Sequence, residues 1–246
     1  LKQFILTESV CHSPEFAFEK NTDNVAKAIE NFKIHYPVAQ DNDFATWSAY
    51  NNQYWPAEYL IDAQGNLRAT HFGEGNYEET EEHIRALLKE AKQDLSLPTM
   101  NPTITDTTPH QNQSPETYLG TDRRANYRAG SIVDELKNDQ WTLTGKWIED
   151  KQFITSTAGN TLSFGDTGQK IYLALNTPAG YGRVKILLDG QTIKADQAGN
   201  DVKDGTVLVD SDRLYNLIHN TKDRDAHVLT IEFETTGIKA FAFTFG

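Results

Sequence analysis

An abrupt change of composition at residues 97–115 constrains the fold of this 246-residue chain more than any other feature. The segment is rich in Pro, Thr, Asn and Gln, and prolines are spaced along it. These prolines are Pro98, Pro102, Pro109 and Pro115. Proline spaced in this way keeps a chain extended and outside packed elements. The sequence therefore predicts two domains, at residues 1–96 and 116–246, joined by a linker.

The second domain shows little helical periodicity. Short segments of alternating apolar and polar residues recur at intervals of about ten residues, with Gly, Asn or Asp between them. The predicted strands lie at residues 141–147, 153–156, 161–164, 170–175, 182–188, 206–209, 228–233 and 240–245. Residues 212–219 are either a turn or a short strand, with Leu214, Leu217 and Ile218 on the buried side. This pattern predicts an all-β sandwich of the jelly-roll type.

The first domain mixes strands with amphipathic helices. Strands are predicted at 4–10, 57–61 and 67–72, an extended piece at 36–39, and helices from residue 22 and at 43–50. Pro56 cannot donate a hydrogen bond to a sheet, and it forces Trp55 out of the helical region, so Pro56 belongs at the start of the strand 57–61. The order of elements predicts an α/β domain.

The helix that follows residue 76 is the clearest in the chain. Asn76 with Glu79 three residues later predicts a capping box, and acidic residues crowd the first turn of the helix. Lys89 and Lys92 lie near its other end, where positive charge favours the helix dipole. Gly73 and Gly75 permit the turn that precedes the helix.

Motifs in both domains carry a resemblance to a known family. In the first domain they are residues 12–19 (HSPEFAFE), 36–41 (YPVAQD), 51–57 (NNQYWPA) and 73–77 (GEGNY). In the second they are residues 115–120 (PETYLG), 214–217 (LYNL) and 243–246 (FTFG). The chain resembles the extracytoplasmic part of DipZ-type thiol:disulfide interchange proteins, relatives of the TlpA and ResA redoxins.

This resemblance implies a thioredoxin-like α/β domain, incomplete at its N-terminal side, followed by a jelly roll that resembles a carbohydrate-binding module. It implies a dithiol reductase or isomerase that acts on thiols or disulfides of envelope proteins, in the periplasm or otherwise outside the cytoplasm, with a membrane part as electron donor. In the family, a Cys-x-x-Cys pair lies ahead of the segment that matches residues 4–16. The present sequence contains no such pair, so we expect this polypeptide to be the C-terminal part of such a protein and redox-inactive as given.

Two residues are candidates for binding the substrate. Pro56 resembles the cis-proline that faces the active-site cysteines in thioredoxin-like folds, and Trp55 before it either lines a substrate groove or packs against the preceding helix. We assign no catalytic residue. Cys11 is the single cysteine, and dithiol exchange needs two. The burial preference of free cysteine favours a buried Cys11 without a reactive role.

The second domain offers candidates for glycan or partner binding. Aromatic rings can stack on sugars, and the candidate residues are Trp141, Trp147, Tyr172, Tyr181 and Arg183. Alternation places Trp141 and Leu143 on the same side of their strand, which favours burial of Trp141 instead. A binding module without chemistry is therefore the alternative function for the whole chain.

Composition limits the other partners. A formal net charge of −12 argues against nucleic acid and anionic membrane, which require clustered Lys and Arg. The histidines show no spacing typical of metal ligands, so we expect no metal, and no motif indicates a cofactor. A thioredoxin-like sheet without its first strand has an unpaired edge. We therefore expect a homodimer across that edge, or a separate polypeptide that covers it.

Overall fold

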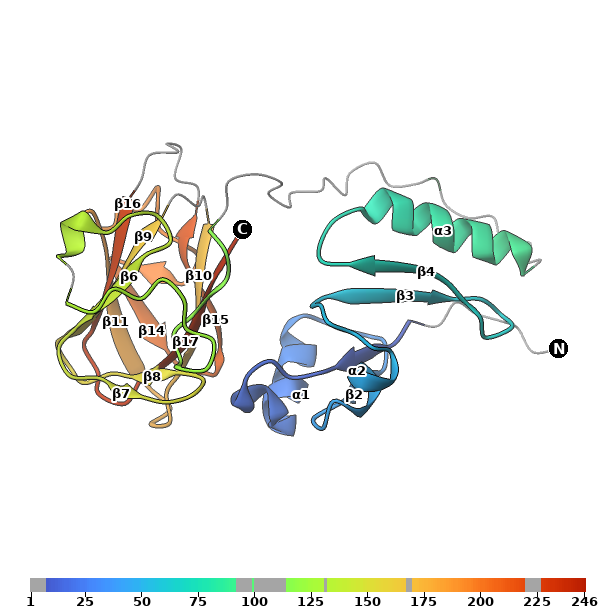
Figure 1. Cartoon of the computed structure of the whole chain (residues 1–246), viewed down its shortest axis with the longest axis horizontal. Coiled ribbons are helices and arrows are strands. Elements are labelled where there is room, and N and C mark those ends of the chain that lie inside the picture. Colours follow the sequence, from blue (N-terminus) through green and yellow to red (C-terminus); the bar gives the residue numbers. More distant parts are fainter. Residues whose placement is uncertain (1–7, 92–98, 100–113, 131, 167–169, 220–226) are drawn as a thin grey trace. The chain divides into compact units, whose positions relative to one another are not determined.

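The computed structural model describes residues 8–91, 99, 114–130, 132–166, 170–219 and 227–246. The chain divides into two compact units, at residues 1–108 and 109–246. Strands predominate over helices in the described residues (Figure 1). Most of the predicted linker 97–115 lies outside the described residues, so the linker and its boundaries remain predictions.

The first unit is an α/β structure (Figure 1). Its elements are β1 (Val10–His12), the 3-10 helix η1 (Ala17–Lys20), α1 (Thr22–Asn31), β2 (Val38–Gln40), α2 (Ala45–Ala49), β3 (Ala57–Ile61), β4 (Leu67–Phe72) and α3 (Tyr77–Glu90). The helices and the β3–β4 hairpin lie where the sequence predicts them. The first strand is later than predicted, since β1 begins at Val10 and residues 4–7 lie outside the described part.

The strands of this unit form two separate sheets. β1 and β2 pair in parallel, with Val10 opposite Val38. β3 and β4 pair antiparallel around a turn in which the Asp62 carboxylate accepts the N–H groups of Gln64 and Asn66. Within the described residues, no strand pairing joins one sheet to the other.

The start of α3 corrects the predicted capping box. Asn76 precedes the helix with a left-handed backbone (φ +51°), and its side chain accepts no capping hydrogen bond. Gly73 and Gly75 also have positive φ, so the chain enters the helix through a left-handed turn, as the two glycines predicted. This turn carries the Asn76 side chain away from the N–H groups that a capping box requires.

Little of the first unit is buried. Among its described residues, Pro14 and Phe16 are the apolar side chains that are buried, and no residue of α1, α2 or α3 is buried. Phe32, at the end of α1, is 77% exposed. The apolar face that the sequence predicts for α1 is therefore only partly covered.

The second unit is a sandwich of two β-sheets (Figure 1). One sheet has the strand order β15 (Arg213–His219), β10 (Lys170–Asn176), β17 (Lys239–Phe245), β8 (Ile154–Thr155) and β7 (Ile148–Glu149), with β5 (Thr117–Tyr118) paired to β17. The other has the order β13 (Val202–Lys203), β14 (Thr206–Val209), β11 (Gly182–Leu188), β16 (His227–Phe233), β9 (Asn160–Asp166) and β6 (Trp141–Thr144), with β12 (Gln191–Thr192) paired to β11. The unit also contains the 3-10 helix η2 (Val133–Glu135).

The sandwich buries a continuous apolar core. Alternate residues of β11 are buried from Gly182 to Leu188, as expected for a strand with one face on the core. The core also contains the fully buried rings of Trp141, Phe164 and Phe233, and strands of both sheets contribute to it. Trp141 is thus buried, as the alternation of Trp141 and Leu143 along their strand favoured.

Two details of the predicted strands are corrected. The segment 141–147 is not one strand, because β6 ends at Thr144 and Gly145 has a positive φ of +94°. Residues 213–219 form a full strand, and Leu217 and Ile218 are buried as predicted, but Leu214 is 44% exposed. Tyr215 is buried in place of Leu214. The pattern alone therefore placed the wrong residue on the inner side.

Candidate functional site

The segment that leads into β3 is bonded to residues that follow β1 and β4. The Trp55–Pro56 peptide bond is cis, as predicted. The carbonyl of Pro56 accepts the N–H of Gly73, which follows β4, at 2.9 Å. The indole N–H of Trp55 donates to the carbonyl of Ser13, which follows β1, at 3.0 Å. Trp55 and Pro56 are therefore attached to both sheets of the unit.

A buried carboxylate organises the residues around Trp55. Asp41, directly after β2, is only 6% exposed. Its Oδ1 accepts the N–H of Thr46 at 3.0 Å, and its Oδ2 accepts the N–H of Trp47 at 2.9 Å and the hydroxyl of Ser13 at 3.0 Å. Asp41 thus caps the start of α2 and binds the end of β1 with the same group.

These hydrogen bonds keep Asp41 ionised. The N–H of Trp47 has the largest effect and lowers the pKa of the carboxyl. Burial opposes this shift, and the smaller effects of Thr46 and Ser13 add to it, so the pKa lies below the usual value of 3.8. A carboxylate that accepts several hydrogen bonds is stabilised in its charged form.

Trp55 is partly packed and partly exposed. Its ring lies 4.2 Å from the ring of Trp47, centroid to centroid, at an angle of 37°. Nevertheless, 45% of Trp55 is exposed to solvent. The two roles predicted for Trp55 are therefore compatible: one part of the ring packs on α2, and the rest of the residue is accessible to a ligand.

A second group of aromatic rings begins at the adjacent residue. Tyr54 lies 5.0 Å from Phe72, Phe72 lies 6.1 Å from Tyr59, and Tyr59 lies 4.8 Å from Tyr50, all between ring centroids. Tyr54, Phe72 and Tyr50 are each about half exposed. We call Tyr50, Tyr54, Trp55 and Phe72 the aromatic surface. Its area is apolar but its edges carry phenol hydroxyls, which suits contact with a polypeptide.

Cys11 lies in β1, two residues before Ser13. It is exposed, which corrects the expectation that it is buried. The correction has a physical reason: β1 pairs only with β2 within the described residues, so little packs over Cys11. It has no second cysteine with which to form a disulfide.

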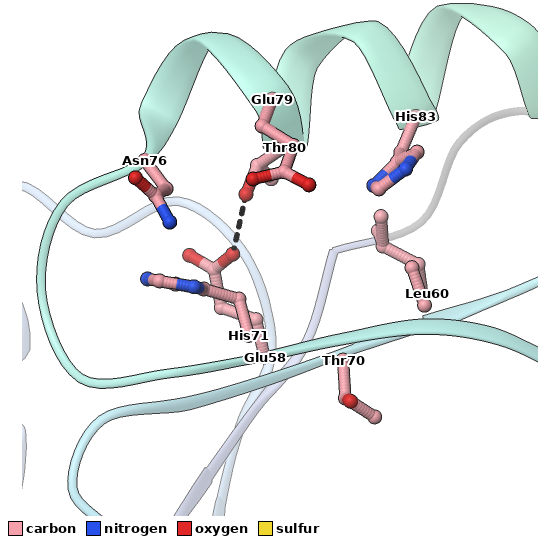
Figure 2. A pocket seen from close by; sticks show the side chains of 9 residues that line it. Glu58, Leu60, Thr70, His71, Asn76, Glu79, Thr80 and His83 are labelled. Atoms are coloured by element: carbon pink, nitrogen blue, oxygen red, sulfur yellow. Dashed lines mark hydrogen bonds between the residues drawn. The ribbon is translucent and has the colours of Figure 1, made fainter.

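A small polar cavity of about 50 Å³ lies between the β3–β4 hairpin and α3. Figure 2 shows Glu58 and His71 of the hairpin facing Asn76 and Thr80 of the α3 region, with the Thr80 hydroxyl donating to Glu58 at 3.1 Å. The Nε2 atom of His71 is buried and lacks a hydrogen-bond partner. The volume suits a few water molecules and is too small for a peptide or a sugar ring.

The five candidate residues of the second unit do not lie together in the structure. Trp141 is 0% exposed and donates its indole N–H to the carbonyl of Ala125, so it belongs to the core and not to a binding surface. This corrects its place among the candidates and agrees with the burial that alternation favoured. Tyr172 lies in β10, opposite Asn216 and Thr244, in the other sheet from the remaining three.

The remaining three candidates lie near the end of β16 and the start of β11. Trp147 follows β6 and packs edge-on against Phe233, at the end of β16, with 5.0 Å between ring centroids. Tyr181, which is 54% exposed, and Arg183 lie at the start of β11. Since Val184 pairs with Phe233, all three lie at the same end of the strands. The guanidinium of Arg183 lies 3.3 Å from the carboxylate of Glu234.

Neither a metal cluster nor a membrane-spanning helix is found in the described residues. No group of three or more His, Cys, Asp or Glu side chains there is arranged to hold a metal ion. Likewise, no helix among these residues is long and apolar enough to cross a membrane.

Sequence reasoning did not single out Asp41 or Ser13. Both fall inside motifs quoted above, and an Asp shortly before a predicted helix is a general cap signal. That signal could have identified Asp41 as the cap of α2. Its contact with Ser13 could not be foreseen, because the two residues are far apart in the sequence.

Comparison with known proteins finds relatives for both units. Residues 114–246 match the family described as "Thioredoxin like C-terminal domain". The chain is 36% identical over 248 residues to Protein DipZ of Mycobacterium bovis and to Protein DipZ of Mycobacterium tuberculosis. Each alignment covers 96% of this chain and 33% of the relative. The chain thus spans about a third of the length of these relatives. NHL repeat-containing protein 2 of Bos taurus is 33% identical over 67 residues, which are 27% of this chain and 9% of that protein.

Parts of the chain also align with solved structures. One is a family two carbohydrate esterase from Clostridium thermocellum, 15% identical, with a TM-score of 0.36 over 44% of this chain and 32% of that one. Another is a family 6 carbohydrate-binding module, 16% identical, with a TM-score of 0.29 over 50% of this chain and 98% of that one. Because both TM-scores are below 0.5, no inference rests on these structures.

Proposed function

The chain belongs to the thioredoxin like C-terminal domain family and is a relative of the DipZ proteins, and from this premise we propose that it is the substrate-contacting part of an extracytoplasmic thiol:disulfide oxidoreductase. The observation that carries the proposal is the 36% identity to Protein DipZ, which extends over 96% of the chain and so includes both units. The proposed substrates are envelope proteins with thiols or disulfides.

The proposed fold of the first unit is a thioredoxin-like domain without its first strand and its cysteine-bearing helix. The order of β3, β4 and α3 after Trp55–Pro56 supports it. So does the separation of the unit into two small sheets, because a strand between β1 and β3 would join them. The proposed fold of the second unit is a jelly roll, which its two packed sheets support.

Trp55 and Pro56 are the proposed contacts with the substrate. Three features support this role. Trp55 is half exposed, and it belongs to the aromatic surface. The two residues are also held in place, because the Trp55 indole N–H donates to Ser13 and the Pro56 carbonyl accepts the N–H of Gly73. Rigid aromatic side chains lose little conformational entropy when they bind a polypeptide.

The proposed contact is tested by affinity for an unfolded polypeptide. A reduced and alkylated protein that carries a fluorescent label serves as the probe, and its anisotropy reports binding to the full chain. Trp55→Ala is expected to weaken binding on the order of tenfold or more, as for a buried aromatic contact. Phe32→Ala, which removes an exposed aromatic ring outside the aromatic surface, is the control and is expected to leave the affinity unchanged. Equal affinities for Trp55→Ala and the unsubstituted chain would contradict the proposal.

The polypeptide is proposed to lack dithiol exchange activity by itself. Exchange requires an attacking thiolate and a second cysteine that resolves the mixed disulfide, and Cys11 is the only cysteine in the sequence. Reduction of insulin by dithiothreitol measures this activity. We expect the chain not to accelerate the reduction, and an acceleration abolished by Cys11→Ser would overturn this part of the proposal.

An edge-covering partner follows from the proposed fold. β1 pairs only with β2, and β3 only with β4, among the described strands. Unpaired edges invite association with another strand. We propose that a second copy of the chain or a separate polypeptide covers them. Sedimentation analysis of the pure chain tests this, and a monodisperse monomer without a second polypeptide would count against it.

The second candidate function is a binding module without chemistry. The position of Trp147, Tyr181 and Arg183 near the end of β16 and the start of β11 supports it, because aromatic rings and a cation suit contact with a glycan or a protein surface. A glycan array probed with the full chain tests this function. Binding that is lost in Tyr181→Ala, an exposed residue, would support it, and the absence of binding to all glycans would exclude a glycan ligand.

A further inference from the structure

The carboxylate of Asp41 joins three segments that are distant in the sequence. It follows β2, it accepts N–H groups at the start of α2, and it accepts the hydroxyl of Ser13 at the end of β1. Its backbone N–H also donates to the carbonyl of His12 at 2.9 Å. Because Asp41 is 6% exposed, water competes weakly for these hydrogen bonds.

The two oxygens of this carboxylate have different roles. Oδ1 accepts the N–H of Thr46, as the oxygen of an ordinary helix cap does. Oδ2 accepts both the N–H of Trp47 and the hydroxyl of Ser13. The second oxygen therefore fixes Trp47 relative to Ser13, which a cap alone would not do.

Trp47 and Ser13 are also the two residues that hold the Trp55 ring. Trp47 stacks on it at 4.2 Å between centroids, and the carbonyl of Ser13 accepts its indole N–H at 3.0 Å. The contacts form a closed circuit from Asp41 through Trp47 and Trp55 to Ser13 and back to Asp41. A circuit of this kind leaves the Trp55 ring few alternative orientations.

We propose that Asp41 is a positioning residue, whose Oδ2 fixes the orientation of the Trp55 ring by holding Trp47 and Ser13 in place. The contacts of the Trp55 ring with Trp47 and with the Ser13 carbonyl determine its orientation. Its consequence for substrate affinity rests on the proposed function, in which Trp55 contacts a polypeptide. Preorganisation of an aromatic contact raises affinity, because less freedom is lost on binding.

The alternative is that Asp41 only caps α2, and one substitution separates the two roles. In Asp41→Asn the amide oxygen can still accept the N–H of Thr46, and Asn caps helices as well as Asp does. The amide NH₂ group, in contrast, cannot accept the N–H of Trp47, although it can donate to the hydroxyl of Ser13. In the orientation that keeps the cap, Asp41→Asn therefore loses the contact with Trp47, whereas Asp41→Ala removes the cap and both positioning contacts.

The matched control is Asp62→Asn in the β3–β4 turn. The carboxylate of Asp62 also accepts two backbone N–H groups, from Gln64 at 2.9 Å and Asn66 at 2.8 Å. The neighbouring hydrogen bonds, of which the largest effect comes from Asn66, likewise lower its pKa. Asp62 differs in that it also pairs with Arg68 at 3.3 Å. It has no contact with Trp47, Trp55 or Ser13 among the hydrogen bonds described, so Asp62→Asn changes a carboxylate that accepts backbone N–H groups outside the circuit.

The experiment measures hydrogen exchange of the Trp55 indole N–H by NMR, in the full chain labelled with ¹⁵N. This proton is protected by its bond to Ser13, and the measurement needs no ligand. We expect exchange on the order of tenfold faster in Asp41→Asn, close to the rate in Asp41→Ala, and no change in Asp62→Asn. The amide signals of α2 should be retained in Asp41→Asn and lost in Asp41→Ala.

Two results would overturn the inference. Unchanged Trp55 exchange in Asp41→Asn would overturn it. If Asp41→Asn unfolds the first unit, Ser13→Ala is used in its place. The loss of the Ser13 hydroxyl should still accelerate the exchange of the Trp55 indole N–H several-fold. Unchanged exchange in Ser13→Ala would also overturn the inference. Affinity for the unfolded polypeptide probe should fall in parallel with the loss of protection. If the unsubstituted chain does not bind the probe at all, the proposed function fails while the exchange result still decides the role of Asp41.

Discussion

At the scale of single residues, the ionised Asp41 gives the first unit a specific dependence on pH. The pKa of Asp41 is lowered below 3.8 in the folded chain, chiefly by the N–H of Trp47. A lowered carboxyl pKa contributes stability that is fully present above the pKa of the unfolded chain and is lost as the pH falls through the folded pKa. The contribution of Asp41 should therefore be complete above about pH 4 and disappear in more acidic solution.

The prediction compares the unsubstituted chain with Asp41→Asn. The unsubstituted chain should be more stable by a constant amount from neutral pH down to about pH 4, and the difference should shrink below that value. Urea unfolding at a series of pH values, followed by the NMR signals of the first unit, measures it. A difference that grows as the solution becomes more acidic would have the wrong sign.

The burial of some residues could be predicted from the sequence alone, whereas the burial and contacts of others could not. The burial of Trp141 followed from alternation along its strand, a local property. The exposure of Cys11 and the bond between Asp41 and Ser13 depend on which segments meet in the folded unit. Residue preferences describe an average environment, so they were wrong for Cys11.

At the scale of elements, the start of α3 offers a test of how a helix begins. Asn76 has a left-handed backbone and makes no capping hydrogen bond with its side chain. The left-handed region costs ordinary residues about 1–2 kcal/mol, and Gly and Asn adopt it most readily. Asn76→Gly should therefore change the free energy of unfolding of the first unit little, whereas Asn76→Ser should lower it by about 1 kcal/mol.

The capping box makes the opposite prediction, because Ser is as good a cap as Asn and better than Gly. Thermal or urea unfolding followed by the NMR signals of α3 distinguishes the two. Equal stability of the Asn76→Ser variant and the unsubstituted chain would support the capping box and contradict the left-handed turn.

Long strands were predictable and short ones were not. β11 (Gly182–Leu188) and β14 (Thr206–Val209) lie where alternation predicts them. β12 and β13 each have 2 residues, too few for alternation to be recognised, and they exist because neighbouring strands pair with them. The capping box was wrong for a similar reason, since the backbone of Asn76 is set by the glycine turn before it.

At the scale of the whole molecule, the two units differ in how much apolar surface they bury. Apart from Pro14 and Phe16, every buried apolar side chain among the described residues lies in the second unit. Burial of apolar surface is the main favourable contribution to folding. The second unit should therefore be the more stable of the two, and the chain should not unfold in a single step.

Hydrogen exchange of the backbone amides measures this difference. Amides in the central strands β10 and β16 are expected to exchange at least about a hundredfold more slowly than amides in β1 and β3. Addition of a polypeptide that covers the edges of β1 and β3 should reduce the difference. Equal protection in both units would show that the first unit is stabilised by contacts other than those described.

The division into two units was predictable because composition changes along the chain. The exposed apolar surface of the first unit, in contrast, was expected only through a family resemblance. Periodicity predicted the apolar face of α1, for example, and could not reveal that Phe32 would be left 77% exposed. What covers such a face depends on the set of elements present, which no local pattern describes.

The central claim is that a polypeptide substrate docks at Trp55–Pro56, and the four tryptophans of the chain allow a direct test. Their indole N–H signals report separately on Trp47 and Trp55 in the first unit and on Trp141 and Trp147 in the second. In an NMR titration of the full chain with a reduced and alkylated, cysteine-containing polypeptide, the signal of Trp55 should shift saturably, that of Trp47 should follow it, and those of Trp141 and Trp147 should not move. Movement of Trp147 alone, or of none of the four, would contradict the claim.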